Sequence, residues 1–263
     1  MIPKEFAEAI AAARPRLGRL ASKVEYYPTI GSTNDAAASM SATEGAVVFA
    51  DAQTEGRGRR GHIWFSPAAT GLYVSVVLAP SRAAVDPCRA VSLTTIAAGV
   101  ALAEGIEKAT ALPNVRLKWP NDLYVGRRKL GGILAEGSAA GDRIDVVVVG
   151  YGINIAKASF PPDLRARVTS IETELGKRPS RARVLAETLA ALAARYDDLL
   201  AGRFDAILDS WRERAHAKGA TVHWETREGT RSGEAVGIAD DGALLVKVDG
   251  VVERIVGGEV TWT

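Results

Sequence analysis

The chain has 263 residues, of which 47% are hydrophobic and 24% are charged, so it can bury a sizeable core and is not expected to be disordered. Lys and Arg total 33 against 31 Asp and Glu, which gives a net charge of +2. This near balance argues against a general nucleic-acid binder, because such proteins carry a strong basic excess. The length suits one large domain, or a medium domain with a small appendage.

The single cysteine and the N-terminal sequence bear on the cellular compartment. Cys88 has no second cysteine with which to form an internal disulfide or a metal cluster, which favours a reducing compartment, and we interpret it as a small core residue. The first 20 residues lack the apolar run of a signal peptide, and we find no apolar stretch near the roughly 20 residues of a membrane span. We therefore expect a cytoplasmic protein that does not enter a membrane.

The first half of the chain predicts helices and short strands. A turn at 31–35 offers Ser and Thr as helix N-caps, and Asp86 followed by Pro87 is a typical helix start. In chain order the predicted elements are a helix at 3–14, an extended segment at 26–29, a helix at 36–40, strands at 46–50 and 71–79, and a helix from 87 onward.

In the second half of the chain, the pattern of predicted elements changes after Gly219. Before that point we predict a strand at 116–119, a hairpin of 123–125 and 130–136, a strand at 144–149 beside it, and a long helical region at 180–216 interrupted near Gly202. After it come five short strands, at 221–226, 231–238, 243–248, 251–256 and 260–263, with turn pairs such as Asp241-Gly242 between them. Five short strands without a helix indicate a small barrel.

The most distinctive segment is Gly56–Gly61, with the sequence Gly-Arg-Gly-Arg-Arg-Gly, which we call the Gly/Arg loop. Glycines let the backbone approach a ligand closely, and arginines offer fork-shaped donors to phosphate or carboxylate. Such a loop suits an anion site that orders over its ligand. From composition alone, a solvated basic loop or an RNA-binding Gly/Arg segment is slightly favoured over such a site. Trp64 and the apolar flanks favour an ordered site.

Three further clusters carry polar groups at strand ends. The run 118–122 combines Lys, Trp, Pro, Asn and Asp, a set able to hold a nucleotide and Mg²⁺, although an ordinary turn has the same residues. Lys129 precedes the pair Gly131-Gly132 and either reaches into a pocket or lies on the surface of a hairpin turn. Asn154 ends an apolar strand and needs hydrogen-bond partners, which a ligand or the neighbouring backbone would provide.

Taken together and in order, these clusters resemble the biotin–protein ligases. The segments that carry the resemblance are 31–34, Gln53 with 56–64, 118–122, 129–136 and 150–155, and, in the C-terminal part, 241–245 and 257–259. Each motif alone is modest, whereas the ordered combination of the Gly/Arg loop with Lys-Trp-Pro-Asn-Asp is highly specific. The resemblance covers nearly the whole chain from about Tyr27.

The resemblance implies an α+β fold. It comprises a class II synthetase-like catalytic domain, with a mixed β-sheet and flanking helices, over residues 1–217, and an SH3-like small β-barrel over 218–263. It also implies a two-step reaction, in which biotin and ATP give biotinyl-5'-AMP, and the biotin is then transferred to a lysine of a biotin carboxyl carrier domain of a carboxylase. Joining two anions requires charge neutralisation, and an adenylate must be shielded from water.

The family's site residues carry over to matching positions. Lys129 and Arg59 are the expected catalytic residues, Asp122 is the expected Mg²⁺ ligand, and Trp64 is expected to pack against the adenylate. The expected biotin-binding residues are Ser32, Thr33, Asn34, Gln53, Gly56, Arg57, Gly58, Arg59 and Lys129. The expected nucleotide-binding residues are Arg59, Arg60, Trp64, Lys118, Asn121 and Asn154.

Two departures from the family pattern stand out. The family loop usually has Arg where this chain has His62, so we expect the handling of pyrophosphate to be weaker or sensitive to pH. Fewer than thirty residues precede the region of Tyr27, too few for the helix-turn-helix domain of many bacterial relatives, so we expect no operator-binding repressor function.

Two rival functions remain open from the sequence. Lipoate ligation shares the expected fold and adenylate chemistry, but lipoate has no ureido ring, so Ser32, Thr33 and Gln53 favour biotin. A non-enzymatic nucleic-acid binder would use the Gly/Arg loop and bind in a salt-dependent manner. We expect no nucleic-acid partner, and we consider a homodimer possible, with residues 143–150 as a strand that pairs across it.

Overall fold

The computed structural model describes residues 1–41, 43–140, 143–157, 160–216, 219–226, 229–258 and 260–262. The α-helices are α1 (Lys4–Ala13), α2 (Thr33–Ala38), α3 (Pro87–Thr110), α4 (Pro162–Arg165), α5 (Ile171–Leu175), α6 (Arg181–Leu200) and α7 (Phe204–Arg214). The strands of the catalytic part are β1 (Val24–Tyr27), β2 (Val47–Ala50), β3 (Gly71–Leu78), β4 (Arg116–Lys118), β5 (Asp122–Val125), β6 (Arg128–Ala140) and β7 (Arg143–Asn154). The C-terminal strands are β8 (Thr221–Thr226), β9 (Gly229–Ile238), β10 (Leu244–Val248), β11 (Val251–Ile255) and β12 (Val260–Trp262).

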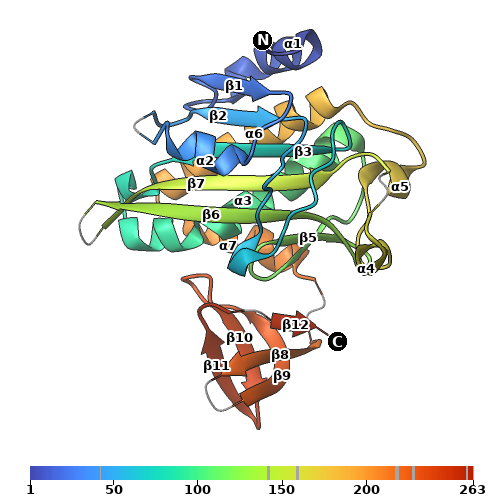
Figure 1. The fold of residues 1–263 in the computed structure, drawn as a ribbon. Coiled ribbons are helices and arrows are strands. Elements are labelled where there is room, and N and C mark those ends of the chain that lie inside the picture. Colours follow the sequence, from blue (N-terminus) through green and yellow to red (C-terminus); the bar gives the residue numbers. More distant parts are fainter. Residues whose placement is uncertain are drawn as a thin grey trace.

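A seven-stranded mixed sheet organises the catalytic part, with the strand order β1-β2-β3-β7-β6-β5-β4 (Figure 1). β1 and β2 pair in parallel, and the other neighbours pair antiparallel. β7 is an interior strand, because residues 147–153 pair with β3 on one side and with β6 on the other. A dimer built through this stretch of β7 would therefore lack a free strand edge, and a homodimer stays a prediction.

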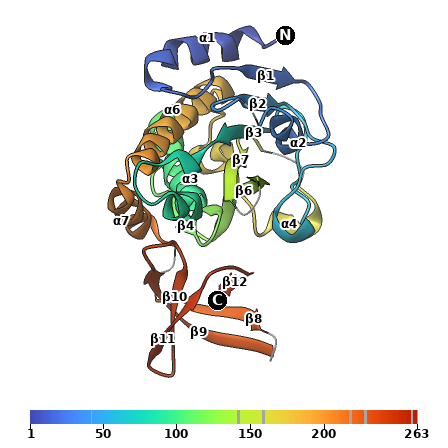
Figure 2. The same ribbon diagram turned by 90° about the vertical axis from the view of Figure 1, so that its left-hand side faces the viewer.

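Helices cover the two faces of the sheet unequally. α3, α6 and α7 lie on one face, and α2 and α4 lie on the other (Figure 2). α3 begins where the sequence predicts, since the Asp86 side chain accepts a hydrogen bond of 3.0 Å from the Arg89 amide and Pro87 follows. Its side chains, among them Leu93, Ile96 and Val100, are buried in the main core. The face that carries α2 remains available for a functional site.

Two expectations from the sequence are wrong. By length and hydropathy, α3 is one helix that meets the requirements of a membrane span, although 72% of its most apolar window is buried inside the protein, as in the core helix of a globular fold. Cys88 lies at the start of the same helix and is exposed, not part of the core. The first turn of α3 leaves that side chain exposed, which its position in the sequence does not reveal.

The C-terminal part is an antiparallel five-stranded sheet with the order β11-β10-β9-β8-β12, as expected of a small SH3-like barrel. It contacts the catalytic part directly: Trp119 Nε1 donates to Gly242 O at 2.9 Å, and Arg89 Nε donates to Asp240 O at 2.8 Å. The predicted domain boundary at 217–218, and the motif residue Glu259, lie outside the described residues. That boundary stays a prediction.

Candidate functional site

A cavity of about 430 Å³ opens on the sheet face that carries α2. Its walls come from the start of α2, the Gly/Arg loop, the turn between β4 and β5, strands β6 and β7, the segment 160–168 and the barrel residues Gly258, Val260 and Thr261. The sequence-predicted residues that line it are Ser32, Thr33, Asn34, Gln53, Arg57, Gly58, Arg59, Arg60, Trp64, Lys118, Asn121, Asp122, Lys129 and Asn154. Gly56 is buried beside the cavity, where an added Cβ would lie 2.5 Å from Trp64 O, so its role is close packing.

One end of the cavity is a buried polar cluster at the start of α2. Ser32, Thr33 and Asn34 are 3–5% exposed, and α2 begins at Thr33 after the extended Ser32. Gln53 Oε1 accepts hydrogen bonds from Thr33 N at 2.9 Å and from Thr33 Oγ1 at 3.0 Å. The structure thus brings together residues twenty positions apart, and their donors and acceptors suit a small polar group such as a cyclic urea.

Ser75 completes this cluster and was not predicted from the sequence. Its hydroxyl is fully buried, 2.8 Å from Thr33 Oγ1 and 2.5 Å from Asn34 Oδ1. Gly150 allows Asn34 to approach β7, because a Cβ at that glycine would lie 2.0 Å from Asn34 Oδ1. A lone serine in an apolar strand carries little signal, whereas Gly150 belongs to a Gly-Tyr-Gly motif that the sequence does show.

The Gly/Arg loop forms a compact turn over the cavity. Gly58 N donates to His62 O at 2.7 Å, and Trp64 N donates to Gly56 O at 2.8 Å, so the loop returns on itself. Arg60 has the left-handed backbone angles φ 54° and ψ 33° inside this turn. The loop is therefore an ordered turn, and its residues Arg57, Gly58, Arg59 and Arg60 line one cavity.

Trp64, Lys129 and Asp122 meet at the centre of the cavity. Lys129 Nζ lies 2.7 Å from Asp122 Oδ1 and 5.4 Å from the centroid of the Trp64 ring. The indole packs onto the sheet where Gly152 leaves room, since a Cβ there would lie 2.2 Å from Trp64 Nε1. Lys129 is therefore a pocket residue and not a surface lysine, with its ammonium held between a carboxylate and an aromatic face.

Asn121 and Asn154 both serve the backbone while lining the cavity. Asn121 Nδ2 donates to Ile133 O at 2.6 Å, which ties the β4–β5 turn to β6. Asn154 Nδ2 donates to Thr169 O at 3.0 Å, which holds the segment after α4 against β7. The backbone partner that the sequence left open for Asn154 is thus present.

Lys118 and Tyr124 form the wall next to the barrel. Lys118 Nζ lies 5.2 Å from the centroid of the Tyr124 ring and 3.5 Å from its hydroxyl. Burial, and then the charge of Asp122, raise the pKa of Tyr124 to about 12. This phenol stays protonated at neutral pH and can donate a hydrogen bond.

Few carboxylates are placed where they could hold a metal ion in the described part of the cavity. Among the described parts of the chain, no three His, Cys, Asp or Glu side chains lie close enough together to hold one. Among the cavity-lining residues that the structure describes, Asp122 is the one carboxylate, and it lies beside Lys129. Mg²⁺ commonly binds through one or two carboxylates together with substrate phosphates, so this arrangement fits an ion that arrives with a nucleotide.

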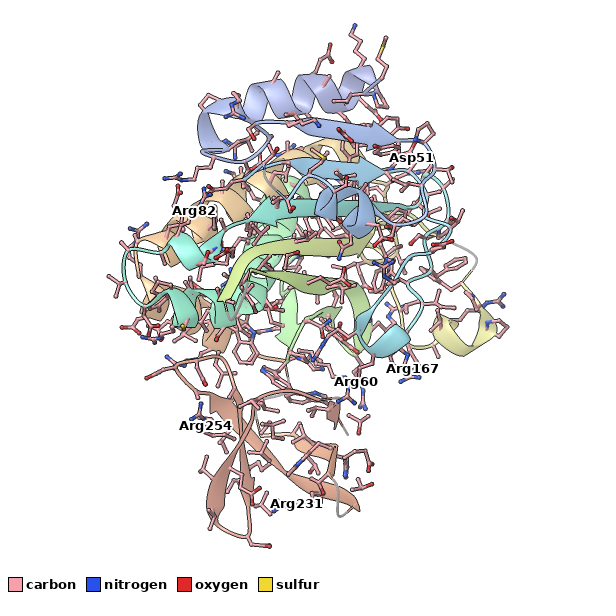
Figure 3. All side chains as sticks on the ribbon, turned by 60° about the vertical axis from the view of Figure 1, so that its left-hand side comes forward. Asp51, Arg60, Arg82, Arg167, Arg231 and Arg254 are labelled. Carbon is pink, nitrogen blue, oxygen red and sulfur yellow. The ribbon has the colours of Figure 1, made fainter. Side chains whose placement is uncertain are left out.

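Several further cavity residues were not predicted from the sequence. Phe160, Leu164 and Arg167 come from the segment around α4, and Val260 and Thr261 come from the barrel. Figure 3 shows Arg60 and Arg167 at the edge of the catalytic part that faces the barrel. α4 has four residues, too few for a periodic pattern, and convergence of barrel and catalytic part is a tertiary property.

Comparisons with known proteins agree with this geometry. The model of the biotin/lipoate A/B protein ligase family matches residues 26–154, and that of the biotin protein ligase C-terminal domain matches residues 219–261. The bifunctional ligase/repressor BirA of Bacillus subtilis is 33% identical over 240 residues, which cover 89% of this chain and 72% of the relative. The biotin–[acetyl-CoA-carboxylase] ligase of Mycobacterium tuberculosis is 33% identical over 241 residues, which cover 88% of this chain and 85% of the relative.

Solved structures share the whole architecture. The biotin protein ligase of Aquifex aeolicus in complex with biotin and ATP has a TM-score of 0.80 at 26% identity, with 92% of this chain and 99% of that chain covered. The biotin protein ligase of Leishmania major in complex with biotinyl-5-AMP has a TM-score of 0.61 at 27% identity, over 89% and 98%. The predicted fold class is confirmed, and the chain belongs to the biotin protein ligase family.

Proposed function

We propose that the protein is an ATP-dependent biotin–protein ligase that makes biotinyl-5'-AMP and passes the biotin to a lysine of a biotin carboxyl carrier domain. One observation carries the proposal: a single cavity has a buried neutral polar cluster at one end and cationic side chains at the other. The neutral end suits a ureido ring, and the cationic end suits a carboxylate that meets a triphosphate.

The neutral end consists of Ser32, Thr33, Asn34 and Gln53, which we assign to the biotin ring. The backbone of Arg57 and Gly58 lines the same end of the cavity. Because the hydrogen-bonding groups of Thr33 and Gln53 are already oriented by each other at 2.9 and 3.0 Å, little ordering is required when the ring binds.

In the first step an oxygen of the biotin carboxylate attacks the α-phosphorus of ATP. The bond from that phosphorus to the bridging oxygen breaks, and pyrophosphate leaves with the bonding electrons. We assign Lys129 to the carboxylate and α-phosphate, and Arg59, Arg60 and Lys118 to the phosphate side, where their charges offset the repulsion of two anions. Trp64 packs beside the adenylate, and Asn121 and Asn154 line the nucleotide end.

Mg²⁺ bound with the nucleotide would supply further charge neutralisation, and Asp122 is the residue that would hold it. The 2.7 Å contact between Asp122 and Lys129 links the carboxylate to the proposed catalytic ammonium. Asp122 also keeps that ammonium in place between the sheet and the Trp64 ring.

In the second step the amine of the acceptor lysine attacks the acyl carbon of the adenylate. An amide bond forms, the acyl–oxygen bond to AMP breaks, and the amine loses a proton. The acceptor is a carrier domain of a biotin-dependent carboxylase in the cytoplasm. The Gly/Arg loop covers the intermediate until the carrier arrives, which limits its hydrolysis.

Pyrophosphate–ATP exchange tests this proposal and separates it from lipoate ligation. The enzyme is incubated with labelled pyrophosphate, ATP and either biotin or lipoate. Exchange driven by biotin is the expected result, because only biotin has a ring that uses the Thr33–Gln53 cluster. Exchange driven by lipoate alone would overturn the proposed substrate.

A further inference from the structure

Arg57 ties the Gly/Arg loop to the start of α2. Its Nη1 donates to Asp35 Oδ2 at 2.8 Å, and its Nη2 donates to Asp35 Oδ1 at 2.5 Å. This two-bond, fork-to-carboxylate geometry is the strongest form of an Arg–carboxylate pair. The pair joins residues 22 positions apart, and both terminal nitrogens of the Arg57 guanidinium donate to Asp35.

A second carboxylate supports the same guanidinium from β6. Glu136 Oε2 lies 3.8 Å from Arg57 Nη2 and accepts a hydrogen bond of 2.6 Å from Asn34 Nδ2. The pKa values of the pair agree with this geometry. The hydrogen bond from Arg57 lowers the pKa of Asp35. The hydrogen bond to Asp35 raises the pKa of Arg57, and the charges of Glu136 and Glu55 raise it further. Arg57 is thus held from α2 and from β6.

Holding Arg57 also holds the rest of the loop. The Arg57 backbone forms a β-bridge with Ile63, and the amides of Gly58 and Trp64 close the turn on either side. Displacement of Arg57 would therefore release both ends of the turn that covers the cavity. The remaining cations of the loop, Arg59 and Arg60, would move with it.

We infer that Asp35 is a positioning residue that latches the Gly/Arg loop over the cavity through Arg57 and so slows escape of the adenylate. The second half of this inference rests on the proposed function. Asp35 is not among the described residues that line the cavity, and its effect passes through Arg57. The charge of Arg57 holds the loop closed over the cavity, so the loop backbone remains available to contact the ligand.

The latch is weak enough to open in each turnover. The side chains of Arg57 and Asp35 are 38% and 59% exposed, so water and salt screen the pair. An exposed ion pair changes an equilibrium by roughly two- to fivefold, and the bidentate geometry places this one toward the upper end of that range.

Trypsin cleavage in the loop measures the latch without any substrate, since Arg57, Arg59 and Arg60 are themselves cleavage points. Asp35→Asn removes the charge, Asp35→Glu keeps it, and Glu55→Gln removes a nearby exposed carboxylate that has no hydrogen bond to Arg57. The inference predicts cleavage about two- to fivefold faster in Asp35→Asn, at an unchanged melting temperature, with the other two variants near wild type. Equal cleavage of Asp35→Asn and wild type, or equal acceleration in Glu55→Gln, would overturn it.

Escape of the intermediate is the second readout. Enzyme loaded with biotin and ATP is diluted, and biotinyl-5'-AMP released to solution is followed. Asp35→Asn is expected to release it several-fold faster than wild type, with the KM for biotin unchanged; release at the wild-type rate would overturn the functional part of the inference. If wild type forms no adenylate, the proposed function fails, and the trypsin experiment still decides whether the latch exists.

Discussion

Two glycines of β7 provide a sharp test of how the cavity is divided. Gly150 and Gly152 lie two positions apart on one face of the same strand. Neither has a positive φ angle, so the backbone itself would accept alanine and only contacts with neighbouring side chains oppose the added methyl group. A Cβ at Gly150 would lie 2.0 Å from Asn34 Oδ1, and a Cβ at Gly152 would lie 2.2 Å from Trp64 Nε1. Each added methyl must displace a different side chain.

The displaced contacts set the expected magnitudes. Moving Asn34 breaks its hydrogen bond with the buried Ser75 hydroxyl, which keeps Thr33 Oγ1 as an acceptor, so the loss is that of one hydrogen bond, about 0.5–1.5 kcal/mol. Moving Trp64 removes the aromatic face 5.4 Å from Lys129 Nζ, an interaction worth about 0.5–2 kcal/mol. If these losses fall on substrate binding, they correspond to roughly 2- to 13-fold for biotin in Gly150→Ala and roughly 2- to 30-fold for ATP in Gly152→Ala.

Biotin-dependent pyrophosphate–ATP exchange measures both effects, with biotin and ATP varied in turn. Gly150→Ala is expected to raise the KM for biotin more than that for ATP, and Gly152→Ala to do the reverse. Gly132→Ala is the milder control, because its Cβ would lie 3.1 Å from the edge of the Trp64 ring, a contact that a small shift relieves. Equal effects of Gly150→Ala and Gly152→Ala on both substrates, in variants that melt like wild type, would refute the division into a biotin end and a nucleotide end.

Three other predictions follow from the same geometry. Lys129→Ala should slow adenylate formation about 10²- to 10³-fold while the melting temperature stays near that of wild type, and wild-type exchange would contradict its role. Arg59→Gly should release the adenylate early and label lysines of bystander proteins, as counted by mass spectrometry; unchanged selectivity would speak against a shielding loop. Burial, and then the charges of Lys118, Arg116 and Arg127, lower the pKa of His216, so the unfolded chain binds more protons than the folded protein between that lowered pKa and the ordinary value of 6.5. Unfolding free energy should therefore fall more steeply from pH 8 to pH 5 in wild type than in His216→Phe, as measured by denaturant titration at each pH.

The elements that sequence patterns place well are those with strong local signals. The Asp86-Pro87 start of α3, the interior strand β3 and the five short C-terminal strands lie within a few residues of their predicted limits. α4 and α5 were missed because four or five residues are too few for a helical period to show. Cys88 was misplaced because hydrophobic character alone does not give the direction of a side chain in the first helical turn.

The site shows the same division between local and tertiary information. Local chemistry singled out the Gly/Arg loop and the run 118–122, but only the resemblance to a family connected them with Thr33 and Gln53. Ser75 and Arg167 had no local signal, since one lies in an apolar strand and the other follows a very short helix. The place of Ser75 depends on which strands become neighbours, which is the sheet order β2-β3-β7-β6, and Arg167 is placed by the hydrogen bond from Lys129 N to its carbonyl.

Transfer to a carrier domain tests the central claim most directly. The protein is incubated with biotin, ATP and magnesium and with a biotin carboxyl carrier domain, and the intact mass of the carrier is recorded. The account predicts a gain of one biotinyl group at one lysine, which disappears when ATP is omitted, when that lysine is replaced by Arg, or when Lys129→Ala replaces the wild-type enzyme. A carrier that stays unmodified, although the enzyme is folded and supplied with biotin and ATP, would contradict it.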